Sequence, residues 1–360
     1  MRKTILYLVV LVILAFGVYY FLFRSNDSNP YSIKEAGFTV KDTAAIGKLF
    51  IATSDGTSVT VVRTDSGWVV NNTYKALPST LNLILITLTQ QAPLYPVTKN
   101  AVDNVIKGLS TDGTKVEVYG KDGKKMRVFY VGGGAVNNTG TNMLIEGAQT
   151  PYVVQVPGFN GYLTSRYTAD MKYWRDRTVF NIPAEDIKSV AVHYALKPVN
   201  SFEIIRDNND SLTIKADPAL TRGLDGPNTR RAKVYLKYFT NVNCEGYLNG
   251  LSDMDTTLKT AAKQSSIDIT DKRGQQHHMD IYWVALNKRS KNISESSTDV
   301  PDDYDADRLY AVINNGKDTV MIQQYAFRNI FHKAYEFFQK DGTGAQPQEA
   351  PKNVMMHKDQ

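Results

Sequence analysis

Five acidic side chains near the C-terminal end are the densest group of candidate metal ligands in the chain: Asp299, Asp302, Asp303, Asp305 and Asp307. Carboxylates at alternate positions, as in Asp303-x-Asp305-x-Asp307, are what a calcium-binding loop supplies. However, Arg308 stands where an EF-hand loop needs its glycine, and Asn314 stands at the twelfth position in place of glutamate. We therefore expect a solvated loop here, with weak Ca²⁺ binding as the alternative.

The histidines and the single cysteine do not form a chelating pattern. His277 and His278 are adjacent at the start of an expected strand, so their side chains point to opposite faces and do not readily hold one ion. His193 and His332 each stand alone. Cys244 allows neither an intrachain disulfide nor a cysteine-based zinc site. We expect hydrogen-bonded or solvated histidines and a buried, unreactive cysteine.

The glycines and serines lack the context of a catalytic motif. Gly132-Gly133-Gly134 follows an expected strand but has neither G-x-G-x-x-G spacing nor a G-K-[ST] ending, so we expect a hairpin turn. No serine lies in a G-x-S-x-G or S-x-x-K context. Paired carboxylates that cleave a glycosidic bond meet in space and not in sequence, so an envelope hydrolase stays open. We assign no catalytic, cofactor-binding or metal-binding residue, and we expect a protein that is not an enzyme and has no cofactor.

The elements that position these side chains predict an α+β fold with mainly antiparallel sheets, because most expected strands are joined by short turns. Apolar spacing within 81–88 predicts a helix with Pro78 in its first turn. A second helix within 102–109 is expected to end at Gly108. The turn sequence Gly120-Lys121-Asp122-Gly123 predicts a hairpin.

The second half of the chain repeats the order of the first. The matched positions are Ile46 with Ile187 at an offset of 141, Leu81 with Ala232 and Val116 with Ile267 at 151, and Phe159 with Phe327 at 168. Offsets that rise in steps are expected of a duplicated unit with two loop insertions, here near 216–230 and 285–308. Trp174-Arg175-Asp176-Arg177 joins the halves. We expect it to be an ion-paired linker pinned by its tryptophan, with part of a binding surface as the alternative.

The N-terminal residues predict a membrane anchor. Nineteen uncharged residues, Ile5–Phe23, are long enough to span a bilayer as a helix, and Arg2, Lys3 and Arg24 flank them. The cationic start favours a cytoplasmic N-terminus and an extracytoplasmic body. Cleavage as a signal peptide near Ala15-Phe16-Gly17 is the alternative.

These patterns give the expected organisation and localisation of the chain. The expected segments are a cytoplasmic stub (1–4), a transmembrane anchor (5–23), a spacer (24–45), two similar α+β repeats (46–178 and 179–340) and a disordered tail (341–360). This places a single-pass protein in the inner (cytoplasmic) membrane, with its C-terminal body in the periplasm. The lone cysteine suits a bacterial envelope protein better than an exported eukaryotic one.

Charge gives little reason to expect nucleic acid as a partner. The formal net charge is +6, and the three cations beside the anchor account for half of it, so the exported part carries about +3. No dense block of Lys and Arg marks an electrostatic footprint for phosphates.

Several phrases, in order along 38–330, resemble a known family. They are Gly67-Trp68-Val69-Val70, Val116-Glu117-Val118-Tyr119, Tyr130-Val131-Gly132-Gly133, Pro151-Tyr152-Val153-Val154, Val156-Pro157-Gly158-Phe159-Asn160-Gly161-Tyr162-Leu163 and Trp174-Arg175-Asp176-Arg177, with the helix Leu81–Leu88 among them. Together they resemble the bacterial domain-of-unknown-function family 4340 (DUF4340), in its Bacteroidetes form. The resemblance implies a membrane-anchored envelope protein, in some cases one encoded beside auxiliary parts of ABC-type exporters. It carries no functional residues across.

The sequence therefore favours a non-catalytic accessory or scaffold subunit that binds another envelope or transporter protein. The alternative is a module that binds cell-wall glycan or another ligand, since 21 tyrosines and three tryptophans suit stacking on sugars.

Overall fold

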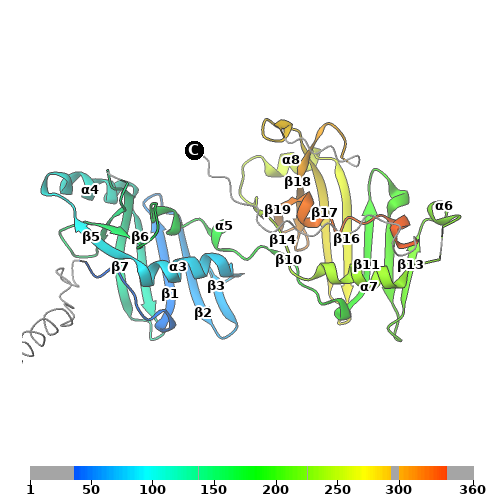
Figure 1. Cartoon of the computed structure of the whole chain (residues 1–360), viewed down its shortest axis with the longest axis horizontal. Helices are drawn as coiled ribbons and strands as arrows, with labels where there is room; N and C mark the ends of the chain where they lie inside the picture. Colours follow the sequence, from blue (N-terminus) through cyan, green and yellow to red (C-terminus); the bar gives the residue numbers. More distant parts are fainter. Residues whose placement is uncertain (1–35, 137, 225, 293–299, 339–360) are drawn as a thin grey trace, which may run out of the picture. The chain divides into compact units, whose positions relative to one another are not determined.

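The computed structural model describes residues 36–136, 138–224, 226–292 and 300–338 (Figure 1). The chain divides between Asp176 and Arg177 into two compact units, each with its own large sheet and apolar core. Among the described residues, no helix has the length and apolar character needed to cross a bilayer. The expected anchor (5–23) and the expected tail (341–360) lie outside the described residues.

The first unit is built on a nine-stranded antiparallel sheet with the order β4-β3-β2-β1-β6-β7-β8-β9-β5. Its strands are β1 (Ile46–Thr53), β2 (Ser58–Thr64), β3 (Gly67–Val70), β4 (Tyr74–Lys75), β5 (Ala92–Pro96), β6 (Thr114–Gly120), β7 (Lys125–Gly134), β8 (Thr141–Ile145) and β9 (Tyr152–Gln155). Period-two alternation buries residues such as Leu49 and Val118 on one face of this sheet.

Helices of the first unit cover parts of the sheet. Helix α3 (Pro78–Gln90) runs across the strands in Figure 1 and buries Leu81, Ile84 and Leu88 in the same core. Its Pro78 stands at the first helical position, where a missing N–H costs no hydrogen bond. Helix α4 (Lys99–Asp112) contacts β7 and β8, and a single turn, α5 (Met171–Trp174), ends the unit.

The second unit holds an eight-stranded antiparallel sheet with the order β13-β12-β11-β16-β17-β18-β19-β15. Its strands are β11 (Ile187–Tyr194), β12 (Phe202–Arg206), β13 (Leu212–Ala216), β15 (Gly246–Tyr247), β16 (Lys263–Asp271), β17 (Gln276–Ala285), β18 (Tyr304–Ile313) and β19 (Asp318–Gln323). A separate pair joins β10 (Thr178–Phe180) to β14 (Val242–Asn243).

An aromatic core fills the buried side of the second sheet. Helix α7 (Thr229–Leu236) contributes Tyr235, whose ring centroid lies 5.5 Å from that of Phe202 and 5.3 Å from that of Phe337. The Tyr235 hydroxyl donates to the carbonyl of Ile330 at 2.9 Å, which satisfies its only polar group. The remaining helices of the unit are short: α6 (Pro218–Thr221), α8 (Met254–Thr260) and α9 (Gln324–Phe327).

The two large sheets share a detail of register. In the first, the β1–β6 pairing shifts directly after Ile46, which faces Gly120. In the second, the β11–β16 pairing shifts directly after Ile187, which faces Asp271. These positions differ by 141 and 151 residues, the offsets found in the sequence.

Three expected boundaries differ from the structure. Residues 36–45, placed in the spacer, belong to the first unit, because Phe38 is fully buried and Gln91 Nε2 donates to its carbonyl at 2.7 Å. The units divide two residues before the expected repeat boundary at 178/179. The expected helix end at Gly108 is wrong, since α4 continues to Asp112 and Gly113 follows it.

Candidate functional site

The aspartate run does not form a cation site in the described part of the chain. Asp305 and Asp307 lie in strand β18, and Asp305 is fully buried, so the expected solvated loop is wrong for both. Arg289 Nη2 donates to Asp305 at 2.8 Å and its Nη1 donates to Asp307 at 3.0 Å. This guanidinium therefore occupies the position beside the two carboxylates that a metal ion would need. Asp302 and Asp303 form a turn before the strand, and Asp299 lies outside the described residues. No group of three or more His, Cys, Asp or Glu among the described residues could hold a metal ion.

Three of the histidines, His193, His278 and His332, have carboxylate neighbours, as expected of satisfied histidines. His278 Nδ1 lies 2.6 Å from Asp268 Oδ1, and its Nε2 lies 3.2 Å from Asp280 Oδ2. Partial burial lowers the pKa of His278, but the two carboxylates outweigh it and leave the pKa above its ordinary value. His193 is 4.0 Å from the same Asp268. His332 Nδ1 is 2.7 Å from a glutamate of the same segment.

The glycine run Gly132-Gly133-Gly134 ends strand β7, so the expected hairpin turn is wrong. A Cβ at Gly134 would lie 2.1 Å from Cε1 of Tyr162, and one at Gly132 would lie 2.9 Å from Cδ2 of Leu109. Glycine is therefore needed here so that an aromatic ring and helix α4 can approach the strand closely.

The linker and Cys244 have the structural roles that the sequence predicts. Trp174 is fully buried, with its indole N–H donating to the carbonyl of Thr168 at 2.8 Å. Asp176 pairs with Lys75 at 3.4 Å. Cys244 forms no disulfide and is buried in the core of the second unit.

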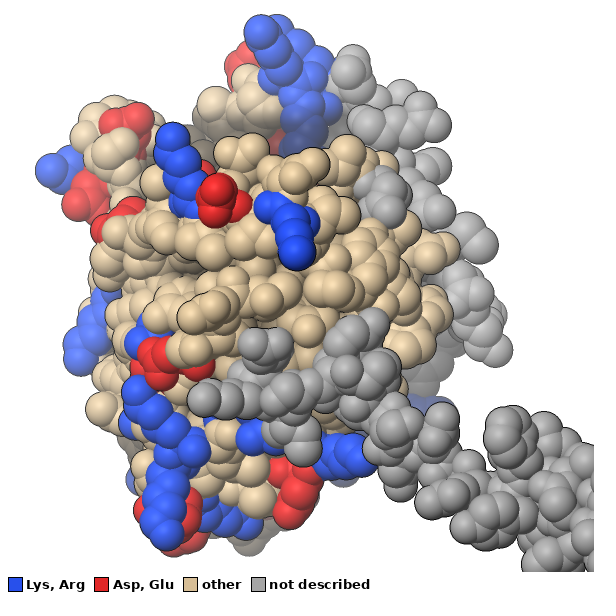
Figure 2. Space-filling view, turned by 90° about the vertical axis from the view of Figure 1, so that its left-hand side faces the viewer, with Lys and Arg blue, Asp and Glu red and all other residues tan. Residues whose placement is uncertain are grey.

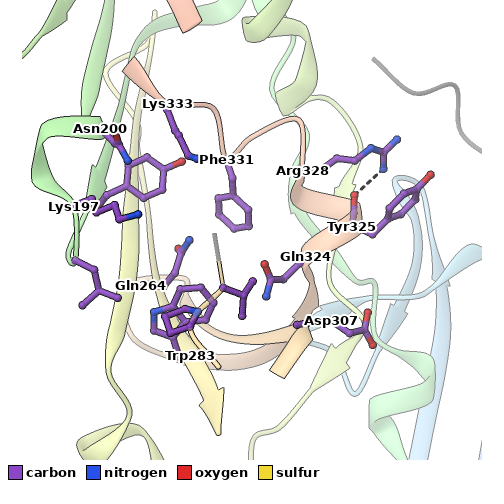
Figure 3. Close-up of a pocket in the computed structure, with 15 residues that line it drawn as sticks. Lys197, Asn200, Gln264, Trp283, Asp307, Gln324, Tyr325, Arg328, Phe331 and Lys333 are labelled. Atoms are coloured by element: carbon purple, nitrogen blue, oxygen red, sulfur yellow. Dashed lines mark hydrogen bonds between the residues drawn. The ribbon is translucent and has the colours of Figure 1, made fainter. Parts of the chain in front are cut away.

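A pocket of about 550 Å³ in the second unit is the candidate functional site (Figure 3). It lies where β11 ends and β16 begins, and its lining includes Tyr194 and Gln264 from these strands. Trp283 comes from β17, and helix α9 supplies Gln324 and Tyr325. The volume is in the range of small-ligand sites.

The charge of this pocket is positive. Among its described lining residues, Lys197, Arg328 and Lys333 stand against a single carboxylate, Asp307, which Arg289 already pairs. Within the described residues, neither Lys197 nor Arg328 forms an ion pair with a carboxylate. The site therefore offers uncompensated cations to a ligand.

The polar groups at the base of the pocket point to a ligand with hydrogen-bond acceptors. Trp283 is 5% exposed, and within the described residues its indole N–H has no acceptor. Its ring stacks on Tyr304, with centroids 5.4 Å apart. The side-chain amides of Asn200, Gln264 and Gln324 also line the pocket (Figure 3). A buried N–H without a partner costs about 1–3 kcal/mol, which an entering acceptor would relieve.

Of the four described aromatic residues that line this pocket, Trp283 and Tyr325 are poorly placed to stack on a ligand, whereas Tyr194 and Phe331 are half-buried. Trp283 is nearly enclosed, with Tyr304 against one face. Tyr325 is 47% exposed, but the Arg328 guanidinium lies over its ring, 3.8 Å from the centroid. Figure 3 shows Arg328 turned back to the Tyr325 carbonyl, to which it donates at 2.7 Å.

The surface charge of the first unit is mixed on the side drawn in Figure 2. Lys and Arg side chains lie beside Asp and Glu near the upper and lower margins, with a broad uncharged area between them. This side carries no continuous basic surface of the kind that binds a phosphate backbone.

Of the described pocket residues, sequence reasoning singled out Asp307, as a candidate Ca²⁺ ligand, and missed the others because they come from separate strands and from the segment after β19. One signal was present, since the offset of 168 aligns that segment with the residues that follow β9.

No protein-family model matches the chain, and neither the curated proteins nor the solved structures contain a match. The resemblance to DUF4340 stays a prediction from the sequence.

Proposed function

We propose that this chain is a non-catalytic binding protein of the bacterial cell envelope, an accessory or scaffold subunit whose second unit holds an acidic segment of another envelope protein. The observation that carries the proposal is the cationic pocket at the junction of β11 and β16, with Lys197 and Arg328 uncompensated within the described residues. Cations that are not paired with a carboxylate of the protein favour a carboxylate-bearing ligand and raise the rate at which that ligand associates with the pocket.

The amide and indole donors fit the same ligand. An extended acidic peptide carries backbone carbonyls as well as carboxylates, so it supplies acceptors to the Trp283 N–H and to the amides of Gln264 and Gln324. Arg328 is the strongest candidate for a bidentate carboxylate contact, because its guanidinium offers two parallel donors.

The two rival functions fit this pocket less well. Sugar binding usually relies on open aromatic faces, and here Trp283 is enclosed and Tyr325 is covered by Arg328, which leaves the half-buried rings of Tyr194 and Phe331 among the described lining residues. Glycoside hydrolysis needs two carboxyl groups, and Asp307 is the only carboxylate among the lining residues that the structure describes.

The placement of the protein and its history are part of the proposal. The apolar run Ile5–Phe23 would anchor the chain in the inner membrane with its body in the periplasm. The matching strand orders and register shifts support one duplicated unit as the origin of both halves. On the resemblance to DUF4340, the expected partner is a component of an ABC-type exporter system.

The test is recovery of partners by the tagged full-length protein after crosslinking in cells, solubilisation in mild detergent and mass spectrometry. The decisive variant is K197E/R328E, which reverses two charges of the pocket. The matched control is K259E/R273E, which reverses one exposed Lys and one exposed Arg elsewhere in the same unit. We expect stoichiometric partner subunits with wild type and control, and their loss with K197E/R328E.

Two results would contradict the proposal. Equal partner recovery by all three proteins would show that the pocket does not take part in the interaction. Turnover of a defined substrate by the purified protein, lost in a point variant, would show an enzyme instead.

A further inference from the structure

The first unit has its own pocket at the position that corresponds to the cationic pocket of the second. It has a volume of about 1050 Å³ and lies where β1 ends and β6 begins. Thr53 lines this pocket and Tyr194 the other, at an offset of 141. Ser165 and Lys333 line the two pockets at an offset of 168.

The charges of the two pockets are opposite. Asp55 and Asp170 line the first-unit pocket, and its lining contains no Lys or Arg. Asp55 accepts from the Thr53 hydroxyl at 2.6 Å and from the Thr57 N–H at 2.8 Å. Asp170 accepts from the Lys172 N–H at 3.0 Å. An ionised carboxylate accepts about four hydrogen bonds, so both retain capacity for a ligand. An acidic ligand is disfavoured here, unlike in the second unit.

Three partly exposed aromatic rings distinguish this pocket further. Tyr162 and Tyr173 are 40% and 55% exposed, whereas the Phe159 ring, 36% exposed, is covered by the Arg166 guanidinium, 3.9 Å from its centroid. The Tyr162 ring lies against Gly134, where a side chain would collide with it, and its hydroxyl hydrogen-bonds to Asn138. The Tyr162 ring is thus held in place by its neighbours yet remains open to a ligand.

Hydroxyl groups complete the lining. Six Ser and Thr side chains line the pocket: Thr53, Thr57, Thr114, Thr164, Ser165 and Thr168. Each hydroxyl both donates and accepts, as sugar hydroxyls do. The partly exposed rings of Tyr162 and Tyr173, with carboxylate acceptors and hydroxyls beside them, match the two sides of a sugar ring, one apolar and one polar.

We propose that the first-unit pocket binds a neutral oligosaccharide of the envelope-glycan type, with the rings of Tyr173 and Tyr162 against sugar faces and the two aspartates accepting from sugar hydroxyls. This pocket and the second-unit pocket lie in different units. One chain would then contact a glycan through one unit and an acidic protein segment through the other.

The experiment measures binding of tetra-N-acetylchitotetraose and cellotetraose to the full-length protein by titration calorimetry, in a detergent without a sugar headgroup. A glycan array screens further neutral oligosaccharides. We expect saturable binding of at least one neutral oligosaccharide. Tyr173→Ala should weaken it about tenfold or more, the effect of losing a well-packed aromatic contact. Tyr173→Phe, which keeps the ring, should bind nearly as well as wild type.

The matched control is Tyr325→Ala, which removes a tyrosine of similar exposure from the second-unit pocket and should leave sugar binding unchanged. The proposal is overturned if no neutral oligosaccharide binds, if Y173A binds as wild type does, or if Y325A weakens binding as much as Y173A. Failure here leaves the partner-recovery result of K197E/R328E intact, and cleavage of a bound sugar would overturn only the non-catalytic function.

Discussion

The substitution Glu117→Gln should cost the first unit a large part of its stability at neutral pH. Glu117 lies in β6 on the face of the sheet opposite Val116 and Val118, and is only 8% exposed. Its carboxylate accepts from the Tyr119 hydroxyl and lies 3.0 Å from Lys115 Nζ and 3.2 Å from Lys125 Nζ. Removing its charge leaves two cations facing a neutral amide.

The magnitude follows from the pKa of Glu117. Burial raises this pKa, but the hydrogen bonds and charges of Tyr119, Lys115 and Lys125 outweigh it and lower the pKa from 4.5 to about 2. At 1.36 kcal/mol per pKa unit, the ionised form contributes about 3 kcal/mol to folding. Because the folded-state pKa is depressed, this contribution is complete above about pH 5 and is lost as pH falls from there toward 2.

The assay is urea unfolding of the full chain in detergent micelles, followed by tryptophan fluorescence in a Trp283→Phe background. Only Trp68 and Trp174, both in the first unit, then report. The matched control is Glu146→Gln, because Glu146 pairs with the same Lys115 at 3.2 Å but its side chain is 43% exposed. An exposed pair of this kind contributes about 0.2–1 kcal/mol.

We expect E117Q to lower the unfolding free energy at pH 7 by about 3 kcal/mol. Between pH 5 and 3, the unfolding free energy of E117Q should decrease less than that of the parent. The reasoning is refuted if E117Q and E146Q lose the same amount at pH 7, or if E117Q keeps the acid dependence of the parent.

Three further predictions concern buried or paired groups. Gln91→Leu should cost about 2–6 kcal/mol, because it leaves both the buried Tyr167 hydroxyl and the Phe38 carbonyl without partners; an unchanged midpoint in the same urea assay would contradict this. Cys244 should react with a maleimide only in urea that unfolds the second unit, because it is 5% exposed; rapid labelling of the native protein, read by mass spectrometry, would show otherwise. His278 should titrate above 6.5 by NMR. Because its folded-state pKa is raised, its contribution to the free energy of unfolding is present below pH 6.5 and is lost as pH rises through the folded-state pKa. His278→Gln should therefore destabilise the protein at pH 6 but not at pH 9, and equal losses at both pH values would refute the pairing.

Much of the fold was predictable because local patterns agree with the tertiary structure. Alternating apolar residues around Leu49 and Ile267 gave strands, and the turn Gly120-Lys121-Asp122-Gly123 gave the β6–β7 hairpin. The edge strand Ala92–Pro96 was missed, because two prolines and no alternation hide a strand that only its pairing with β9 defines. Gly108 was taken for a helix end because glycine is unfavourable inside a helix. The prediction failed because this cost is only about 1 kcal/mol, which packing of the helix overrides.

The candidate sites were not predictable to the same degree. Asp305 looked solvated because its neighbours in sequence are polar, yet Arg289 reaches it from another segment and allows its burial. The three glycines of β7 looked like a turn, because the residues that need the space beside Gly132 and Gly134, Leu109 and Tyr162, are distant in sequence.

The sequence by itself determined the α+β class and the repeated order of elements in the two halves. It also gave the prediction of an N-terminal anchor. These depend on periodicity and composition within short windows. Only the tertiary structure decided which side chains share a pocket. Lys197 and Arg328 come from segments more than a hundred residues apart. They line one pocket because β11 and β19, which precede these segments, lie in one sheet. The same arrangement in the first unit gathers Asp55 and Tyr173 instead, so one architecture carries two pockets of opposite charge.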